Sequence, residues 1–221
     1  MNVSGKISVE DHSGKKIHHS GNSQIDDILD AENVTAEGII KFEKMQADDI
    51  NMRGEISFDS IQTQSMKLEG TIRFKNIVGK NIHLRGTFNG DSIVADSIII
   101  DGALNVGEIE SDDLQINFSS KNEIQKIINK VALNIFPTET EEKKKIVADF
   151  LSSILSREVD VKSEKPRIFI GSIEGNEIEL RNCNCKTVHC KKAILRDGCK
   201  IDDLKCESVD SDGSVKILNK E

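Results

Sequence analysis

The sequence predicts an all-β fold: a single-stranded parallel β-helix, three-sided, with about sixteen residues per coil and one α-helical hairpin inserted into it. Three observations support this prediction. Glycines recur at a fixed interval, and apolar residues alternate between them with the period of a β-strand. A helical pattern replaces this repeat over residues 118–165. The crossover rule for parallel strands favours right-handed winding.

Five glycines mark the repeat, because each follows the previous one by sixteen residues. These glycines are Gly38, Gly54, Gly70, Gly86 and Gly102. A glycine that recurs at one corner of every coil indicates a backbone with positive φ, which other residues adopt only at a higher cost.

The residues between the glycines form three inward-facing pairs. When each glycine is counted as position zero, the pairs fall at positions two and four, seven and nine, and twelve and fourteen. Residues two apart point to the same side of a strand, so each pair predicts one short strand. In the coil that begins at Gly54 these residues are Ile56, Phe58, Ile61, Thr63, Met66 and Leu68. Stacking buries these side chains continuously, which a lone coil could not do.

The same register returns near the C-terminus, so the coils on both sides of the insertion belong to one solenoid domain. We expect an irregular N-terminal segment with a capping coil over residues 1–33, and coils over 34–117 and 166–221. The large inward positions are apolar throughout these coils except at Gly90 and Ser211.

The insertion, residues 118–165, reads as two amphipathic helices joined by a short turn. Pro137 separates the helices, and Thr138 with Glu141 makes a capping box for the second one. The apolar faces either pack on the β-helix or on each other, or they form a contact surface for another protein. The candidate residues for a partner contact are Ile127, Val131, Phe150 and Ile154.

Composition argues against several classes of function. The net charge of -8 is the opposite of what a phosphate-backbone binder needs, so no nucleic-acid partner is expected. No apolar run has the roughly 18 residues that span a bilayer. The first sixteen residues lack the apolar core of a signal peptide. We therefore expect a cytoplasmic protein with reduced thiols.

The five cysteines suggest a metal cluster at first sight. They are Cys183, Cys185, Cys190, Cys199 and Cys206, and none forms the C-x2-C pair that is usual in zinc sites. All five fall on inward positions, where a free cysteine behaves as a small hydrophobic residue. We expect them to pack in the core, and we expect neither a bound metal nor a cofactor.

No group of residues predicts catalysis. His83 and His189 occupy outward strand positions without an evident partner. The acidic pairs Asp48–Asp49 and Asp112–Asp113 share one corner, but the coils between them carry other residues there. A calcium site would need oxygen ligands on adjacent coils. We therefore expect a solvated corner and no enzymatic activity.

The glycine-punctuated, Ile-rich coils resemble the bactofilin family. Residues 54–74 (GEISFDSIQTQSMKLEGTIRF) carry the resemblance in the first half of the chain. Residues 171–183 (GSIEGNEIELRNC) and 198–204 (GCKIDDL) look like the bactofilin-like proteins of Gram-positive bacteria. The resemblance implies a right-handed β-helix that associates end to end without a nucleotide and serves as a cytoskeletal scaffold in cell shape, motility or appendage placement.

Two departures from the family pattern matter. The helical insertion is not part of the compact family core. The charged tail, residues 1–16, lacks the short apolar membrane-targeting peptide of many members, which counts against membrane attachment. Peripheral association with the membrane stays as the alternative to a purely cytoplasmic location.

The expected function is that of a non-enzymatic scaffold whose coils self-associate at their ends, with Val209, Val215 and Ile217 as the candidate contact residues. Open ends of a β-helix expose unpaired backbone groups that can template further strands. The alternative is a β-helical regulator that binds a protein partner through the helical insertion.

Overall fold

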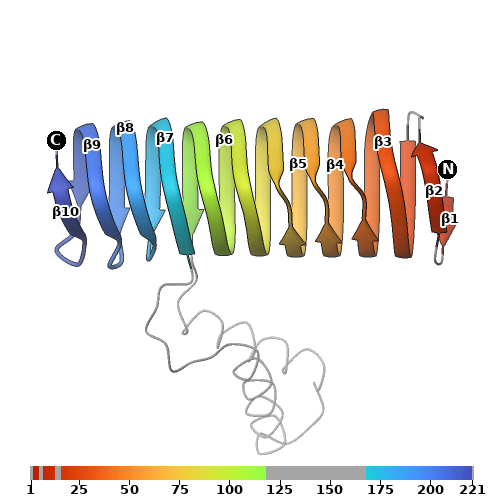
Figure 1. The fold of residues 1–221 in the computed structure, drawn as a ribbon. Coiled ribbons are helices and arrows are strands. Elements are labelled where there is room, and N and C mark those ends of the chain that lie inside the picture. Colours follow the sequence, from red (N-terminus) through yellow and green to blue (C-terminus); the bar gives the residue numbers. More distant parts are fainter. Residues whose placement is uncertain (1, 5–6, 13–15, 118–167, 221) are drawn as a thin grey trace, which may run out of the picture. The chain divides into compact units, whose positions relative to one another are not determined.

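The computed structural model describes residues 2–4, 7–12, 16–117 and 168–220. These residues form a parallel β-solenoid of about nine turns with about sixteen residues per turn, and none of them is helical (Figure 1). The predicted helical hairpin over residues 118–165 lies outside the described residues. The same holds for its candidate contact residues, Ile127, Val131, Phe150 and Ile154.

Ten strands make up one sheet, and all of them pair in parallel with residues about one coil away. The strands are β1 (Asn2–Ser4), β2 (Ile7–His12), β3 (Lys16–Lys41), β4 (Lys44–Ser57), β5 (Ser60–Arg73), β6 (Asn76–Asn117), β7 (Ile168–Arg181), β8 (Asn184–Arg196), β9 (Lys200–Ser211) and β10 (Lys216–Lys220). Strand order follows chain order, so β1 and β2 lie at one end of the stack and β10 at the other.

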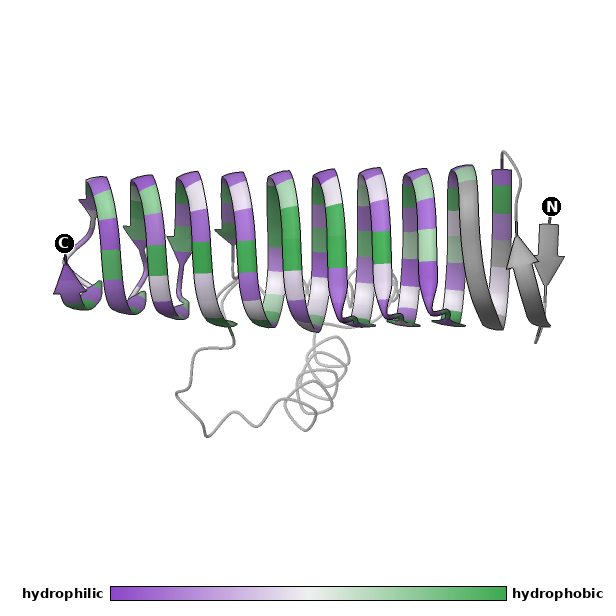
Figure 2. Cartoon of the chain, turned by 45° about the horizontal axis from the view of Figure 1, so that its top comes forward, coloured by the Kyte–Doolittle hydropathy of each residue, from purple (hydrophilic) through white to green (hydrophobic). Residues whose placement is uncertain are grey.

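The core runs along the inside of the stack, at the positions that the repeat predicts. Met66 of β5 pairs with Ile50 of β4 and with Ile82 of β6, so equivalent residues stack from coil to coil. Ile61 and Leu68 are at most 2% exposed, as the prediction of inward positions requires. Hydrophobic and hydrophilic residues accordingly alternate along the coils that are coloured by hydropathy in Figure 2.

The glycine corner has the backbone conformation that the repeat predicts. The φ angles of the five repeat glycines lie between +125° and +143°. A Cβ atom on Gly70 would come within 2.1 Å of the carbonyl oxygen of Gly54, one coil earlier. Both the dihedral angle and the close backbone approach therefore require glycine. Gly21, with φ +96°, extends this column by one coil towards the N-terminus.

The strands are longer than the three short segments per coil that the sequence suggests. Pairing continues through the glycine corner, where Gly38, Gly54 and Gly70 are themselves partners in the ladder. The breaks after β3, β4 and β5 instead fall at positions four and five. There the amides of Asp59 and Ser60 both donate to the carbonyl of Glu43.

Gly90, an exception among the large inward positions, is explained by a stack of aromatic rings. Phe42, Phe58 and Phe74 occupy position four of three successive coils, with ring centroids 5.0 and 5.8 Å apart. A Cβ atom on Gly90 would lie 2.3 Å from the Phe74 ring. The phenyl ring of one coil therefore fills the space that a side chain of the next coil would need.

Polar residues at position nine are buried without loss of hydrogen bonds. Thr63 donates its hydroxyl to the carbonyls of Asp48 and Ser65, at 2.9 and 3.0 Å. Ser111 makes the equivalent pair of bonds with Asp96 and Asp113. This arrangement removes the penalty of burying an unpaired hydroxyl.

The ladder continues into regions whose apolar pattern is less regular. β1 pairs with residues 18–20, and β2 pairs with residues 23–28, so strands occupy much of the N-terminal segment that we expected to be irregular. The register between β3 and β4 shifts once, between Ile28 and Ala31. On the other side of the insertion, Leu104 of β6 pairs directly with Ile168 of β7. Residues 118–167 thus interrupt the chain without shifting the register.

Candidate functional site

The C-terminal end of the stack brings together the three residues predicted for self-association. β10 pairs with residues 200–204 of β9, and within the described residues no strand stacks on the rest of β9. Val209, Val215 and Ile217 occupy inward positions of this last coil and pack against the core while staying half-buried. We call this surface, made of these three side chains and the free edges of β9 and β10, the C-terminal face.

Leu218 adds an apolar side chain next to the C-terminal face that the sequence reasoning missed. Its side chain is 73% exposed, the largest value among the exposed large hydrophobic residues. The signal was weak, because Leu218 sits one residue beyond an inward position in the repeat. Unpaired strand edges next to apolar side chains are the usual features of an edge that accepts further strands.

A turn anchored by Asp212 holds β10 in place. The carboxylate of Asp212 accepts hydrogen bonds from the backbone N–H of Asp197, at 3.0 Å, and from both the N–H and the hydroxyl of Ser214. The hydroxyl of Ser214 also accepts a bond from the Gly198 amide, at 2.7 Å. These donors, the Ser214 hydroxyl first among them, hold the pKa of Asp212 below its ordinary value.

Charges of opposite sign alternate along one column of the outer surface. The column lies just before the glycine corner and consists of Glu37, Arg53, Glu69, Arg85 and Asp101. Arg53 donates to the Glu69 carboxylate at 2.7 Å, and this bond lowers the pKa of Glu69. In a parallel in-register stack, identical residues would place like charges side by side. The alternation replaces that repulsion with attraction between neighbouring coils.

The two histidines that the sequence places on outward positions have different surroundings. His83 was expected to lack a partner, but its Nε2 lies 3.2 Å from the Asp101 carboxylate one coil further on. His189 lies on the rim of a shallow groove. The acidic pairs Asp48–Asp49 and Asp112–Asp113 are exposed to solvent, as expected for a polar corner. Among the residues that the structure describes, no three histidine, cysteine or acidic side chains are grouped so that they could hold a metal ion.

The five cysteines lie inside or at the border of the core, and all of them are free thiols. Cys183, Cys185 and Cys199 are buried, and burial raises the pKa of Cys185 to about 12. Cys190 and Cys206 are only half-buried. The expectation of inward packing therefore holds fully for three cysteines and in part for two.

Two shallow grooves run along the corner next to position nine, where small side chains leave space. One, of about 400 Å³, crosses four coils over Ala31, Ala47, Thr63 and Gly79. The other, of about 500 Å³, crosses three coils over Gly175, Cys190 and Cys206. Both grooves therefore follow the corner beside position nine, where the side chains are small.

In the described part of the chain, no helix has the length and hydropathy needed to cross a membrane. Comparisons with protein-family models, curated proteins and solved structures find no match.

Proposed function

We propose that this protein is a non-enzymatic, bactofilin-like scaffold that self-assembles end to end in the cytoplasm, in support of cell shape, motility or appendage assembly. The proposal includes right-handed winding of a three-sided coil. The C-terminal face is the observation that supports it: Val209, Val215 and Ile217 continue the core to a surface where, among the described residues, no strand pairs with the outer edges of β9 and β10.

Burial of the apolar side chains on the C-terminal face is the driving force for assembly. Docking a second solenoid on the C-terminal face would extend the parallel ladder and cover the half-buried apolar side chains. A head-to-tail contact between identical molecules generates a filament when the rotation that it imposes does not close a ring, and the proposed contact adds each molecule along the solenoid axis. Because apolar burial drives the contact, moderate salt should change it little. No nucleotide is needed for this assembly.

The test is the assembly state of variants on the C-terminal face. Sedimentation velocity and electron microscopy of the purified protein should show filaments or large oligomers. Val215→Lys and Ile217→Lys should abolish them and leave the circular dichroism spectrum unchanged, because each charge lands on the last coil and not within the stack. Val78→Lys is the matched control, since Val78 is 45% exposed on a lateral surface in the middle of the solenoid.

The proposal fails if the parent protein stays monomeric at high concentration, or if the lysine variants at positions 215 and 217 assemble like the parent. The second candidate would then take its place, a regulator that binds a protein partner through residues 118–165. One observation favours that candidate: Leu104 of β6 and Ile168 of β7 are direct partners, so the register of these two strands does not depend on residues 118–167.

A further inference from the structure

Two half-buried cysteines on adjacent coils lie in close contact. Cys190 of β8 and Cys206 of β9 are direct partners in the parallel ladder, so their side chains point to the same side. Their Sγ atoms are 2.8 Å apart, closer than two sulfur atoms without a bond between them ordinarily approach. Paired residues of adjacent parallel strands are spaced by about 4.8 Å, which falls within the range of about 4.4–6.8 Å between the Cα atoms of a disulfide.

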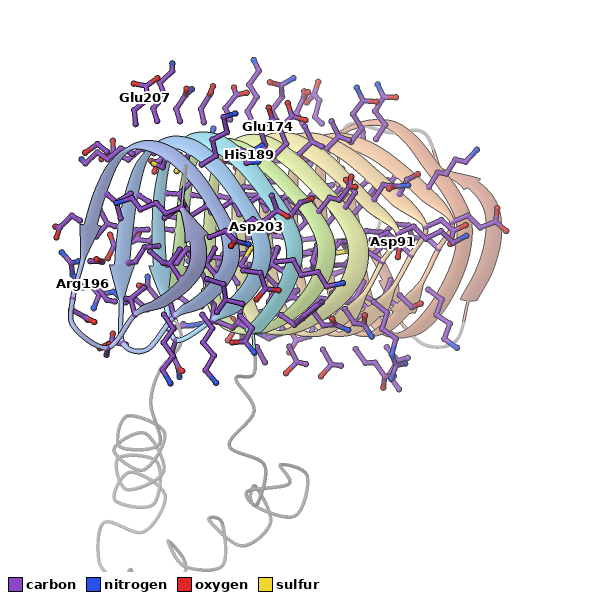
Figure 3. The ribbon with its side chains drawn as sticks, turned by 60° about the vertical axis from the view of Figure 1, so that its left-hand side comes forward. Asp91, Glu174, His189, Arg196, Asp203 and Glu207 are labelled. Atoms are coloured by element: carbon purple, nitrogen blue, oxygen red, sulfur yellow. The ribbon has the colours of Figure 1, made fainter. Side chains whose placement is uncertain are left out.

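The groove makes this pair reachable from solvent. A groove of about 500 Å³ passes over Cys190, Cys206 and Gly175, the partner of Cys190 in β7. Within the described residues no coil stacks on Cys206 from the C-terminal side. The groove is lined by charged and polar residues of three coils, namely Glu174, Asn176, His189, Lys191, Lys205 and Glu207. Figure 3 shows Glu174, His189 and Glu207 along this same surface of the solenoid.

A second cysteine pair in the same coils provides an internal comparison. The Sγ atoms of Cys183 and Cys199 are 3.4 Å apart, and both side chains are fully buried. A dissolved oxidant cannot reach them without unfolding of the coil. Thiol–disulfide exchange requires contact between the attacking sulfur and the dissolved disulfide. The Cys190–Cys206 pair should therefore react, and the Cys183–Cys199 pair should not.

We propose that Cys190 and Cys206 form a dithiol site that exchanges with low-molecular-weight disulfides and closes into a reversible disulfide between β8 and β9. The Cys206 thiolate attacks one sulfur of the small disulfide, and the first small thiolate leaves. The Cys190 sulfur then attacks Sγ of Cys206 as its proton passes to solvent, and the second small thiolate leaves. The protein loses two electrons and two protons, and the small disulfide is reduced to two thiols.

The order of the two steps follows from the surroundings of each sulfur. Burial raises the pKa of Cys190, which keeps this thiol protonated until the mixed disulfide lies beside it. Cys206 lies in the last full coil, and no described residue pairs with it from the C-terminal side. The closed disulfide would tie β9 to β8 with little movement of the backbone, and it would restrain the coil next to the C-terminal face.

The test uses glutathione disulfide as the probe on the full-length, reduced protein. After incubation, remaining thiols are blocked with N-ethylmaleimide in denaturant, and tryptic peptides are identified by mass spectrometry. Cleavage at lysine residues between the cysteines places Cys190, Cys199 and Cys206 in separate peptides. We expect a Cys190–Cys206 cross-link, with Cys183, Cys185 and Cys199 recovered as alkylated thiols. The cross-link should raise the melting temperature by several degrees, and dithiothreitol should reverse this rise.

Variants resolve the two steps. Cys190→Ser should stop at the mixed disulfide, seen as the mass of one glutathione on Cys206. Cys185→Ala, which leaves both sulfurs in place, should form the same cross-link as the parent. The reaction does not depend on filament formation, so the non-assembling Val215→Lys variant should also form it. The proposal is overturned if all five cysteines are alkylated after saturating glutathione disulfide, if Cys183–Cys199 is the main cross-link, or if only intermolecular disulfides appear.

Discussion

The corner glycines show how a single residue type can determine the stacking distance of the coils. Each repeat glycine from Gly54 to Gly102 has its missing side chain directed at the backbone of the glycine one coil before it. Any Cβ atom there would meet a carbonyl oxygen at about 2 Å, in addition to the cost of its positive φ angle. The glycine column is thus a requirement of parallel stacking and not only of a tight turn.

Gly70→Ala should therefore destabilise the protein strongly. We expect a loss of at least about 2 kcal/mol in the free energy of unfolding, from the unfavourable φ angle and from the clash with the Gly54 carbonyl. Gly213→Ala is the control, because a Cβ atom at Gly213 would meet no atom within 4 Å. Denaturant titration followed by circular dichroism measures both. Equal stability of the two variants would contradict the steric role of the column.

Ile82→Asp tests the inward positions in the same way. Ile82 is 2% exposed and stacks on Met66 of the previous coil. A carboxylate there would be buried without a partner, and we expect a loss of about 4 kcal/mol or more at neutral pH. Asn81→Asp places the same group on the neighbouring exposed position and should change stability by about 0.5 kcal/mol or less. Thermal unfolding measures the stability of both variants, and equal melting temperatures would contradict the buried position of Ile82.

At the scale of elements, the terminal strand β10 depends on a few hydrogen bonds more than on burial. Its residues pair with β9 on one side only, and its single half-buried apolar residue is Ile217. The Asp212 carboxylate accepts bonds from the Asp197 amide one coil earlier and from the amide and hydroxyl of Ser214 in the turn that leads into β10. The last coil, and with it the C-terminal face, is therefore sensitive to the ionisation of Asp212.

The pKa shift of Asp212 gives the direction of this pH dependence. Its folded-state pKa lies below the ordinary value, so its contribution to stability is present above the unfolded-state pKa of about 3.9 and is lost as the pH falls through the folded-state pKa. Amide hydrogen exchange at Lys216, whose N–H donates to the Cys199 carbonyl at 2.8 Å, reports the docking of β10. We expect Asp212→Ala to speed this exchange at neutral pH.

The matched control for Asp212→Ala is Asp202→Ala, which removes an exposed carboxylate from β9 outside the turn. Exchange at Lys216 should stay at the parental rate in this variant. If both variants exchange alike, the turn does not hold β10 and its docking depends on side-chain packing alone.

At the scale of the whole molecule, the solenoid is continuous across the insertion. β6 ends at Asn117 and β7 begins at Ile168, yet Leu104 and Ile168 are partners, as are Ile116 and Leu180. The coils on the two sides of residues 118–167 are therefore stacked as if the chain ran through directly. Solenoid stability arises from contacts between neighbouring coils, so a lateral insertion need not contribute to it.

Replacing residues 118–166 with one glycine should leave the solenoid intact. With Arg167 kept, Leu104 and Ile168 would again be separated by sixteen residues, and the new glycine would join the corner column. We expect an unchanged β-type circular dichroism spectrum and a melting temperature within a few degrees of the parent. Loss of folding would show that the insertion supports the stack. The same variant separates the two candidate functions, because a scaffold should still assemble, whereas a regulator should lose its partner.

The sequence by itself determined the period, the inward positions and the conformation of the corner glycines, because these features depend on residue identities that repeat every sixteen residues. Only the tertiary structure decided how neighbouring coils meet. The Phe74 ring occupies the space beside Gly90, Asp101 approaches His83, and two cysteine pairs differ in exposure although all four residues face inwards. Such contacts join residues of different coils, and they depend on side-chain rotamers and on whether another coil covers the site. A repeat pattern contains neither the rotamers nor the coverage of a site by another coil, because it describes each coil as if it were alone.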